Sequence, residues 1–316
     1  MDQGRERLER VPDTSAGTRL DQFLAECLEV SRGEARRLLE AGKVSLDGRI
    51  ASVRDKGRAL QAGAEVGVVD FRPPDRQRIE PDTAADPDAA IRGILARGEG
   101  WLAVDKCPGF PVHPLREHET GTVLNCVASL HPELQGIGEG GLRSGVVHRL
   151  DVETSGILLV ATEQAAWNRL RRGFHEHRVD KVYRAIVAGN LRESLEQEVG
   201  LVVAQHRPAR VRVVDQPDGS KSGGVRAAVQ RVRPLEQFEG ACLVEVQPRT
   251  GFLHQIRSTL AHLGHPVLGD RTYGGDREHP WISRHMLHAA ELRFEEIEVS
   301  SPDPADFAEV VARLRH

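Results

Sequence analysis

The stretch GVVHRLDVETSGILLVAT, residues 145–162, is the part of this 316-residue chain around which its other motifs are arranged. It places a polar segment centred on Asp151 between two apolar runs, Val146-Val147 and residues 157–160. Apolar runs beside glycine predict buried strands, so the polar segment should be a tight connection held by the core. Asp151 is then placed for chemistry, although a loop aspartate commonly caps a helix or braces a turn. This stretch alone leaves both interpretations open.

Composition and cysteine spacing restrict the class of protein. A net charge of -4, with 39% hydrophobic and 28% charged residues, is typical of a soluble globular chain. The N-terminus MDQGRERLER is charged, and no apolar stretch approaches the roughly 20 residues that span a bilayer. The four cysteines form no CxxC pair and the histidines no HExxH motif, so we expect neither disulfides nor a metal site. We expect a cytoplasmic monomer without contact to a membrane.

The patterns divide the chain into four parts. Residues 1–17 are polar without periodicity and are expected to be disordered. Residues 18–71 predict two helices followed by a small sheet, with Ser31 as the cap of the second helix. Residues 72–90, rich in proline, aspartate and alanine, predict a linker. Residues 91–316 mix helical and alternating patterns, which indicates a second, larger domain of the α+β class.

If Asp151 is a nucleophile, it must stay ionised in a site dry enough to hold an organic substrate. Burial alone raises the pKa of a carboxyl group, so a cation is needed beside it. Arg257, near the start of a predicted helix, and Arg149, two residues away, are the candidates. Tyr183, on a predicted strand, offers a flat aromatic face and a hydroxyl group. The chain has no phosphate-binding glycine loop, serine elbow or metal cage, so we expect chemistry without a cofactor.

The first domain resembles the S4 domain, a small RNA-binding module. Its pattern of RLDxxL, then SR, a basic helix and GxVxxxG is matched over about 55 residues. The resemblance implies RNA as the partner and a small α/β fold. Structured RNA is read largely through its backbone, to which arginine forks are well matched. A solvated helix face is the alternative, because Glu34 and Glu40 dilute the cluster. The expected phosphate contacts are Arg32, Arg36, Arg37 and Lys43.

The second domain resembles the RluA-type pseudouridine synthases. HRLDxxTSG is matched by residues 148–156, and DKCPGFPVHP, KVYRA, TGFLHQIR, GHPVLGDRTYG and RHMLHAAEL follow the order of the family's other motifs. The resemblance covers residues 91–294 and implies a mixed, largely antiparallel sheet flanked by helices. It also implies an isomerase that converts uridine in RNA to pseudouridine, with neither metal nor small-molecule cofactor.

The resemblance assigns roles to individual residues. Asp151 would be the nucleophile, Arg257 would hold it ionised, and Tyr183 would stack on the extruded uracil and assist proton removal. Arg149 would enter the space left by the flipped nucleotide, with His148 beside it as a further RNA contact.

Three departures from the family pattern bear on the RNA target. They are Cys107 before the proline of the first motif, Phe252-Leu253 after the glycine of the third, and Glu295-Glu296 after the closing segment. The expected substrate is large-subunit ribosomal RNA, with transfer RNA as the alternative. A non-catalytic RNA-binding scaffold and a metal-dependent hydrolase are the competing classes. The set of Asp151, Tyr183 and Arg257 argues against the scaffold, and histidine spacing argues against the hydrolase.

Overall fold

The computed structural model describes residues 7–82, 90–206, 208–214, 224–274, 279 and 281–316. The chain divides into two compact units, Met1–Gln77 and Arg78–His316. Each unit has its own hydrophobic core and is described by itself.

The first unit packs two helices on a four-stranded sheet. Its helices are α1, Leu20–Cys27, and α2, Arg32–Glu40, and its strands are β1, Arg7–Arg10, β2, Val44–Leu46, β3, Arg49–Ile50, and β4, Glu65–Val68. The sheet order is β1-β4-β2-β3. Ser31 caps α2 as expected, because its hydroxyl accepts a hydrogen bond from the Glu34 amide at 3.1 Å. Leu20, Leu24, Ala35 and Leu39 close the core between the helices and the sheet.

The expectation that residues 1–17 lack structure is wrong for the part that the structure describes. Arg7–Arg10 form β1, which pairs antiparallel with β4, and the next residue, Val11, is buried. Backbone hydrogen bonds to the free edge of β4 hold this strand, and such bonds leave no hydrophobic period in the sequence. Residues 1–6 of this expectation lie outside the described residues.

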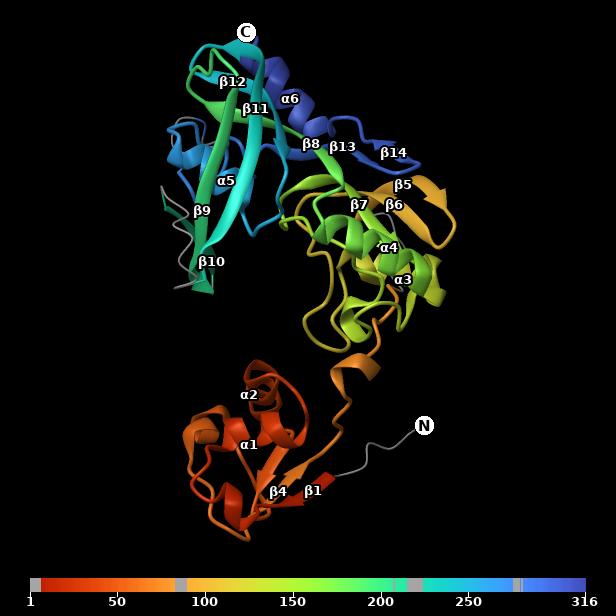
Figure 1. The fold of residues 1–316 in the computed structure, drawn as a ribbon, viewed down its shortest axis with the longest axis vertical. Helices are drawn as coiled ribbons and strands as arrows, with labels where there is room; N and C mark the ends of the chain where they lie inside the picture. The colour runs from red at the N-terminus through yellow and green to blue at the C-terminus, as the bar shows by residue number, and fades with distance from the viewer. Residues whose placement is uncertain (1–6, 83–89, 207, 215–223, 275–278, 280) are drawn as a thin grey trace. The chain divides into compact units, whose positions relative to one another are not determined.

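The second unit is built on one mixed, largely antiparallel sheet of ten strands, which confirms the expected fold class. Along the sheet the order is β10-β9-β11-β12-β8-β13-β7-β6-β5, with β14 on β13, and β13 with β7 is a parallel pair (Figure 1). The strands are β5, Ile91–Gly98; β6, Trp101–Lys106; β7, Ser155–Ala161; β8, Asp180–Ala188; β9, Leu195–His206; β10, Ala209–Val214; β11, Arg226–Phe238; β12, Ala241–Pro248; β13, Leu287–Phe294; and β14, Ile297–Ser300.

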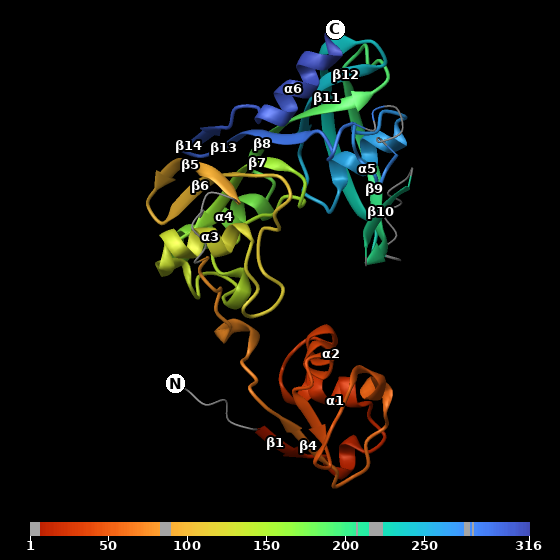
Figure 2. The same cartoon turned by 180° about the vertical axis from the view of Figure 1, so that it is seen from behind.

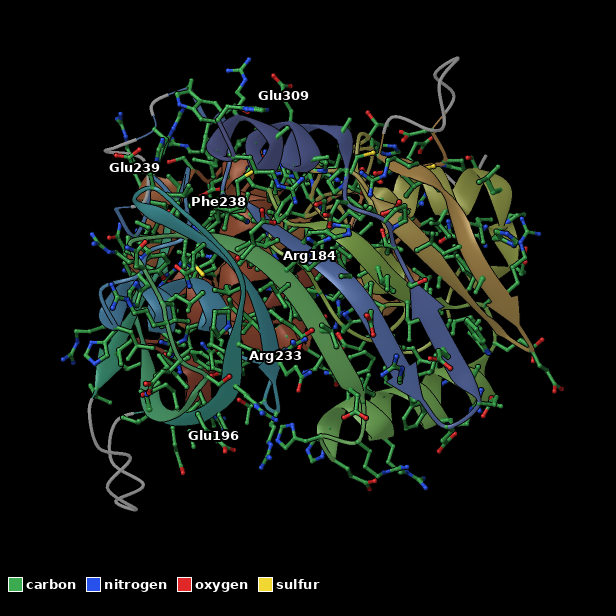
Figure 3. All side chains as sticks on the ribbon, turned by 90° about the horizontal axis from the view of Figure 1, so that it is seen from above. Arg184, Glu196, Arg233, Phe238, Glu239 and Glu309 are labelled. Carbon is green, nitrogen blue, oxygen red and sulfur yellow. The ribbon has the colours of Figure 1, made fainter. Side chains whose placement is uncertain are left out.

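Helices cover this sheet in two groups. The helices α3, Val123–Leu130, and α4, Gln164–His175, lie beside β5, β6 and β7 in both views (Figures 1 and 2). The helix α5, Gln255–His262, lies beside β9 to β11, and α6, Ala305–Leu314, packs Phe307 and Val310 into the core with β8 and β12. Figure 3 shows one face of the sheet, with Arg184 of β8 and Arg233 of β11 labelled on it.

Two further sequence expectations need correction. Val146-Val147 was expected to form a strand, but Val146 makes only an isolated bridge to Val160. The linker expected at residues 72–90 is partly integrated into the second unit, because the side chain of Ile79 is buried in its core. The side chain of Gln135 binds both backbone groups of Ile79: it accepts from the Ile79 amide at 3.2 Å and donates to the Ile79 carbonyl at 2.7 Å. A single apolar residue in a polar segment forms no hydrophobic period, so the sequence did not predict that Ile79 is buried. Residues 83–89 lie outside the described residues.

Candidate active site

Asp151 lies in the short connection that leads into β7. Its backbone carbonyl accepts a hydrogen bond from the Thr154 amide at 3.1 Å, which closes a turn. Its side chain is 22% exposed, so one part of the carboxylate contacts the protein while another can meet a solute. The turn thus presents a carboxylate at the end of a fully buried strand.

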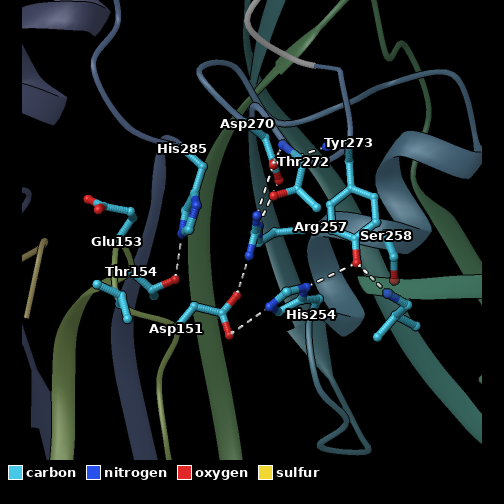
Figure 4. A network of polar contacts seen from close by, with 12 residues as sticks. Asp151, Glu153, Thr154, His254, Arg257, Ser258, Asp270, Thr272, Tyr273 and His285 are labelled. Atoms are coloured by element: carbon cyan, nitrogen blue, oxygen red, sulfur yellow. Dashed lines mark hydrogen bonds and ion pairs between the residues drawn. The ribbon is translucent and has the colours of Figure 1, made fainter. Parts of the chain in front are cut away.

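The carboxylate of Asp151 meets a buried guanidinium group. Arg257 of α5 donates from Nη1 to Asp151 Oδ2 at 2.8 Å (Figure 4). Its other edge is clamped by Asp270, with Nε to Oδ2 at 2.7 Å and Nη2 to Oδ1 at 2.9 Å. These two carboxylates raise the pKa of Arg257 against the opposing effect of burial, so its charge is permanent. The structure therefore brings together the two residues that were expected to pair, although 106 positions separate them.

Asp270 was missed in the sequence, and it is the most buried member of this cluster. Its side chain is fully enclosed, and Oδ1 also accepts from the amides of Thr272 and Tyr273 at 2.9 and 3.2 Å. The backbone of residues 270–273 therefore fixes Asp270, Asp270 fixes Arg257, and Arg257 fixes Asp151. A charged residue in the otherwise apolar and turn-forming run PVLGD is the one local signal that marks this position.

A buried lysine holds the backbone of the Asp151 turn from the other side. Lys106, at the end of β6, has no exposed surface and donates to the carbonyls of Cys107, Val152 and Thr154 at 2.7 to 2.9 Å. Burial lowers the pKa of Lys106 to about 7. Arg284 adds a hydrogen bond to the Glu153 carbonyl at 3.0 Å. Together these cations bind three successive carbonyl groups directly after Asp151 and so restrict the turn to one conformation.

Thr154 and Ser155 anchor the same turn through their hydroxyl groups. The Thr154 hydroxyl lies 2.8 Å from His285 Nε2, and the Ser155 hydroxyl lies 3.0 Å from His288 Nδ1. All four side chains are buried, and burial lowers the pKa of both histidines, which are therefore neutral at pH 7. Through these contacts the two hydroxyl groups tie the turn to the segment of residues 285–288.

Tyr183 lies on β8, opposite Val246 of β12 and Ala289 of β13. Burial raises the pKa of its phenol, and the negative charge of Asp151 raises it further. The phenol therefore stays protonated at neutral pH. A protonated hydroxyl within the electrostatic reach of Asp151 can donate a hydrogen bond, and its ring can stack on a flat ligand.

His148 and Arg149 differ in their surroundings. His148 accepts a hydrogen bond from the Leu159 amide at 2.9 Å and stacks on Phe174, with ring centroids 4.5 Å apart. Burial lowers the pKa of His148 to about 3, so the ring is neutral and both its edge and its face are occupied within the protein. These contacts favour a structural role over the RNA contact expected for it. Arg149 is exposed and free to meet a ligand from solution.

The four basic residues of the first unit that are expected to contact phosphate do not form one cluster. Arg36 forms an ion pair with the fully buried Asp21 at 2.8 Å, and Arg37 binds Glu34 on the same helix. Lys43 binds Asp70 at 2.8 Å. Arg32, the first residue of α2, is exposed. Of the four expected phosphate contacts, Arg32 is thus the side chain that the described ion pairs leave facing solvent.

Two of the three departures from the family pattern acquire structural reasons. Phe252 and Leu253 pack against Val199, Leu201 and Val211, which form a small apolar cluster between α5 and the outer strands. Glu295 pairs with Arg169 and Arg178 at 3.2 and 3.3 Å, and Glu296 pairs with Arg169 at 2.5 Å. The basic run of α4 is therefore partly neutralised within the protein. Cys107 is half-buried, and its carbonyl is one of the Lys106 acceptors.

The described residues form neither a metal centre nor a membrane-spanning helix. Among them, no group of three or more His, Cys, Asp or Glu side chains is arranged to hold a metal ion. No helix within the same residues has the length and apolar character needed to cross a bilayer.

Comparison with families of known proteins matches both units. The family model described as RNA pseudouridylate synthase matches residues 100–262, and the S4 domain model matches residues 18–66. An uncharacterized RNA pseudouridine synthase of Chloroflexus aurantiacus is 34% identical, with 98% of this chain and 94% of that protein covered. The ribosomal large subunit pseudouridine synthase D of Xanthomonas campestris is 32% identical, with 96% and 91% covered.

Solved structures agree with the fold of the second unit. The human RNA pseudouridylate synthase domain containing 4 superposes with a TM-score of 0.59 at 23% identity, covering 72% of this chain and 95% of that chain. The human RNA pseudouridylate synthase domain containing 1 gives a TM-score of 0.53 at 27% identity, covering 71% and 94%.

Proposed function

The chain belongs to the RNA pseudouridine synthase family, and on this premise we propose that it isomerises uridines of large-subunit ribosomal RNA, with Asp151 as the nucleophile. The observation that carries the assignment of Asp151 is its hydrogen bond from the buried Arg257 at 2.8 Å. Arg257 places its permanent positive charge directly against the carboxylate, and the anionic carboxylate is the form that acts as a nucleophile. Its remaining oxygen is available for attack.

The reaction is balanced without a redox partner. Asp151 attacks the target uridine, the bond between N1 and the ribose C1′ breaks, the uracil turns, and C5 joins C1′. The bond between Asp151 and the nucleotide then breaks, which restores the free carboxylate. N1 gains a proton and C5 loses one, so the product is an isomer of the substrate. The raised pKa of Tyr183 keeps its phenol protonated within the field of Asp151, which supports a role for this residue beside the uracil ring, whereas a protonated phenol cannot itself take up the C5 proton.

The target base has to leave the RNA stack before it can reach Asp151. Extrusion costs a few kcal/mol, which a side chain that fills the vacated space can partly offset. Arg149 is exposed and two residues from Asp151, which supports it as that side chain. Arg32 at the start of α2 is the corresponding candidate for a phosphate contact in the S4 unit.

The names of the relatives support the proposed RNA class. Several are ribosomal large subunit pseudouridine synthases D, and this chain covers more than nine tenths of the length of the one from Xanthomonas campestris. We also propose that the protein acts in the cytoplasm as a monomer. Sequencing that maps pseudouridines in a deletion strain tests the target, and sites confined to transfer RNA would contradict the assignment to ribosomal RNA.

The assay for the nucleophile is tritium release from RNA labelled at C5 of uracil. We expect release with the wild type and none above background with Asp151→Ala or Asp151→Asn. Asp303→Asn is the matched control, since Asp303 pairs with Arg184 and lies outside the proposed site. Equal release by Asp151→Ala and the wild type would show that another residue attacks the uridine. Absence of release by the wild type from total cellular RNA would favour the non-catalytic scaffold.

A further inference from the structure

A second chain of hydrogen bonds ends at His254, whose ring lies beside Asp151 on the side of Oδ1. The Val211 amide donates to the Tyr273 hydroxyl at 2.9 Å, and that hydroxyl lies 3.0 Å from His254 Nδ1 (Figure 4). The far ring nitrogen, Nε2, faces Asp151 Oδ1 at 4.0 Å. The two oxygens of Asp151 therefore face different residues: Oδ2 accepts from Arg257, and Oδ1 lies nearest to His254.

This chain selects one tautomer of His254. Because the Val211 amide can only donate, the Tyr273 oxygen accepts from it and is free to donate its own proton to Nδ1. The proton of the neutral ring is then on Nε2, which points at Asp151. The opposite tautomer would aim a lone pair at the negative Oδ1. Burial lowers the pKa of His254, in agreement with a neutral ring at pH 7.

The position of His254 is enforced by its surroundings. Its backbone φ of 52° is left-handed, which is uncommon for a residue other than glycine, asparagine or aspartate. Its ring meets that of Tyr273 edge to face at 5.8 Å, and the guanidinium of Arg257 lies 5.3 Å from the centre of the same tyrosine ring. The side chain of His254 is only 12% exposed. Tyr273 thus links the cation that pairs with Asp151 to the imidazole beside it.

The donor that results has no acceptor of its own. A separation of 4.0 Å is too long for a hydrogen bond, and among the described residues Nε2 has no other acceptor at bonding distance. A ligand atom in contact with Oδ1 would bring its neighbouring groups within reach of Nε2. The geometry therefore leaves Nε2 as a donor for an acceptor oxygen that lies beside Oδ1, off the line that joins the imidazole to the carboxylate.

We propose that His254 is a further catalytic residue, which donates a hydrogen bond from Nε2 to an oxygen of the target nucleotide, and that Tyr273 positions it by fixing its tautomer. This inference rests on the proposed function, because it requires a uridine at Asp151. The acceptor is an oxygen of the ribose or of the base. A preorganised donor of this kind contributes about 10²- to 10³-fold to the rate when it meets charge developing in the transition state.

Replacing His254 by glutamine or by asparagine distinguishes the contribution of Nε2 from that of Nδ1. The amide nitrogen of glutamine reaches the position of Nε2, whereas that of asparagine reaches only the position of Nδ1. We expect His254→Gln to keep single-turnover tritium release within about 10-fold of the wild type, and His254→Asn and His254→Leu to lose about 100-fold. Asparagine tolerates the left-handed backbone, so the loss in His254→Asn cannot be ascribed to strain. His262→Gln, at the other end of α5, is the control.

Tyr273→Phe tests the selection of the tautomer. It should slow the single-turnover rate by about 10-fold in the wild-type background but leave the rate of His254→Gln unchanged, because an amide has no tautomer to select. A merely structural tyrosine would slow both backgrounds equally, and that result would overturn the role of Tyr273. Equal rates for His254→Leu and the wild type would overturn the role of His254.

A synthetic oligonucleotide that spans the first mapped site identifies the acceptor. If the acceptor is the 2′-hydroxyl, His254→Leu costs nothing further on an oligonucleotide with a 2′-deoxy target; if it is a base oxygen, the loss is the same on both. Either result supports the donor. Failure of the wild type to release tritium from any cellular RNA would instead contradict the proposed function, which keeps the two failures distinct.

Discussion

Asp270→Asn replaces the carboxylate that holds Arg257 by an amide of almost the same shape. In the wild type, the enclosed Asp270 carboxylate accepts two hydrogen bonds from Arg257 and two from backbone amides. Asparagine keeps one oxygen, and its NH2 group must then face the donors of Arg257 or an amide. The variant therefore loses charge-assisted hydrogen bonds and leaves a buried donor without an acceptor.

The magnitude follows from these contacts. A hydrogen bond to a charged group is worth about 1.5 to 3 kcal/mol, and a buried donor left unsatisfied costs about 1 to 3 kcal/mol. Removing one partner of a buried ion pair typically costs about 3 to 5 kcal/mol, which agrees with that sum. We expect the free energy of unfolding of the second unit to fall by this amount. Because Arg257 then loses its fixed orientation, tritium release should also slow by about 100-fold.

Tryptophan fluorescence in a urea titration measures this change in the second unit alone. The chain has three tryptophans, Trp101, Trp167 and Trp281, and all of them lie in that unit. Glu245→Gln is the control, because its two hydrogen bonds to the half-exposed Arg233 should contribute less than about 1 kcal/mol. A loss below about 1 kcal/mol in Asp270→Asn, with wild-type release of tritium, would refute the argument that Asp270 holds the site together.

Three further predictions concern other contacts. Burial lowers the pKa of Lys106 to about 7 from 10.5, so between these pH values the unfolded chain binds more protons than the folded one. The free energy of unfolding of the wild type relative to Lys106→Met should therefore rise by about 1 kcal/mol per pH unit from pH 7 to 10 in urea titrations, and a difference that does not change with pH would contradict this. His148→Leu leaves the Leu159 amide without its acceptor, so it should lower the stability by about 1 to 3 kcal/mol while the RNA affinity in filter binding stays unchanged. Arg32→Glu should weaken RNA binding and reduce its dependence on salt without unfolding the S4 unit. Arg36→Glu places a carboxylate against the buried Asp21 and should instead lower the helical circular dichroism of that unit, and the opposite pattern would assign the RNA contact to Arg36.

Local patterns in the sequence predicted several of the helices and strands in both units. Apolar spacing predicted α1, α2 and α5, and the run of residues 157–160 predicted β7. The residues proposed for the chemistry were also readable, because Asp151, Tyr183 and Arg257 each stand in a motif of fixed local spacing. Where a period was absent, as around Arg7–Arg10 and Ile79, edge pairing and single buried side chains went unpredicted.

The tertiary structure decided which partners these residues have. The spacing of residues does not predict that Asp270 binds Arg257, that Lys106 binds the carbonyls after Asp151, or that Arg36 forms an ion pair with Asp21. The same holds for His254, whose first nitrogen contacts the Tyr273 hydroxyl, which the Val211 amide holds in turn, while its second nitrogen faces Asp151. Secondary structure depends on neighbours along the chain, which a sequence displays directly. Hydrogen bonds between buried side chains depend on how distant segments pack, so the chain alone determined which residues are chemically capable and the fold determined which of them act together.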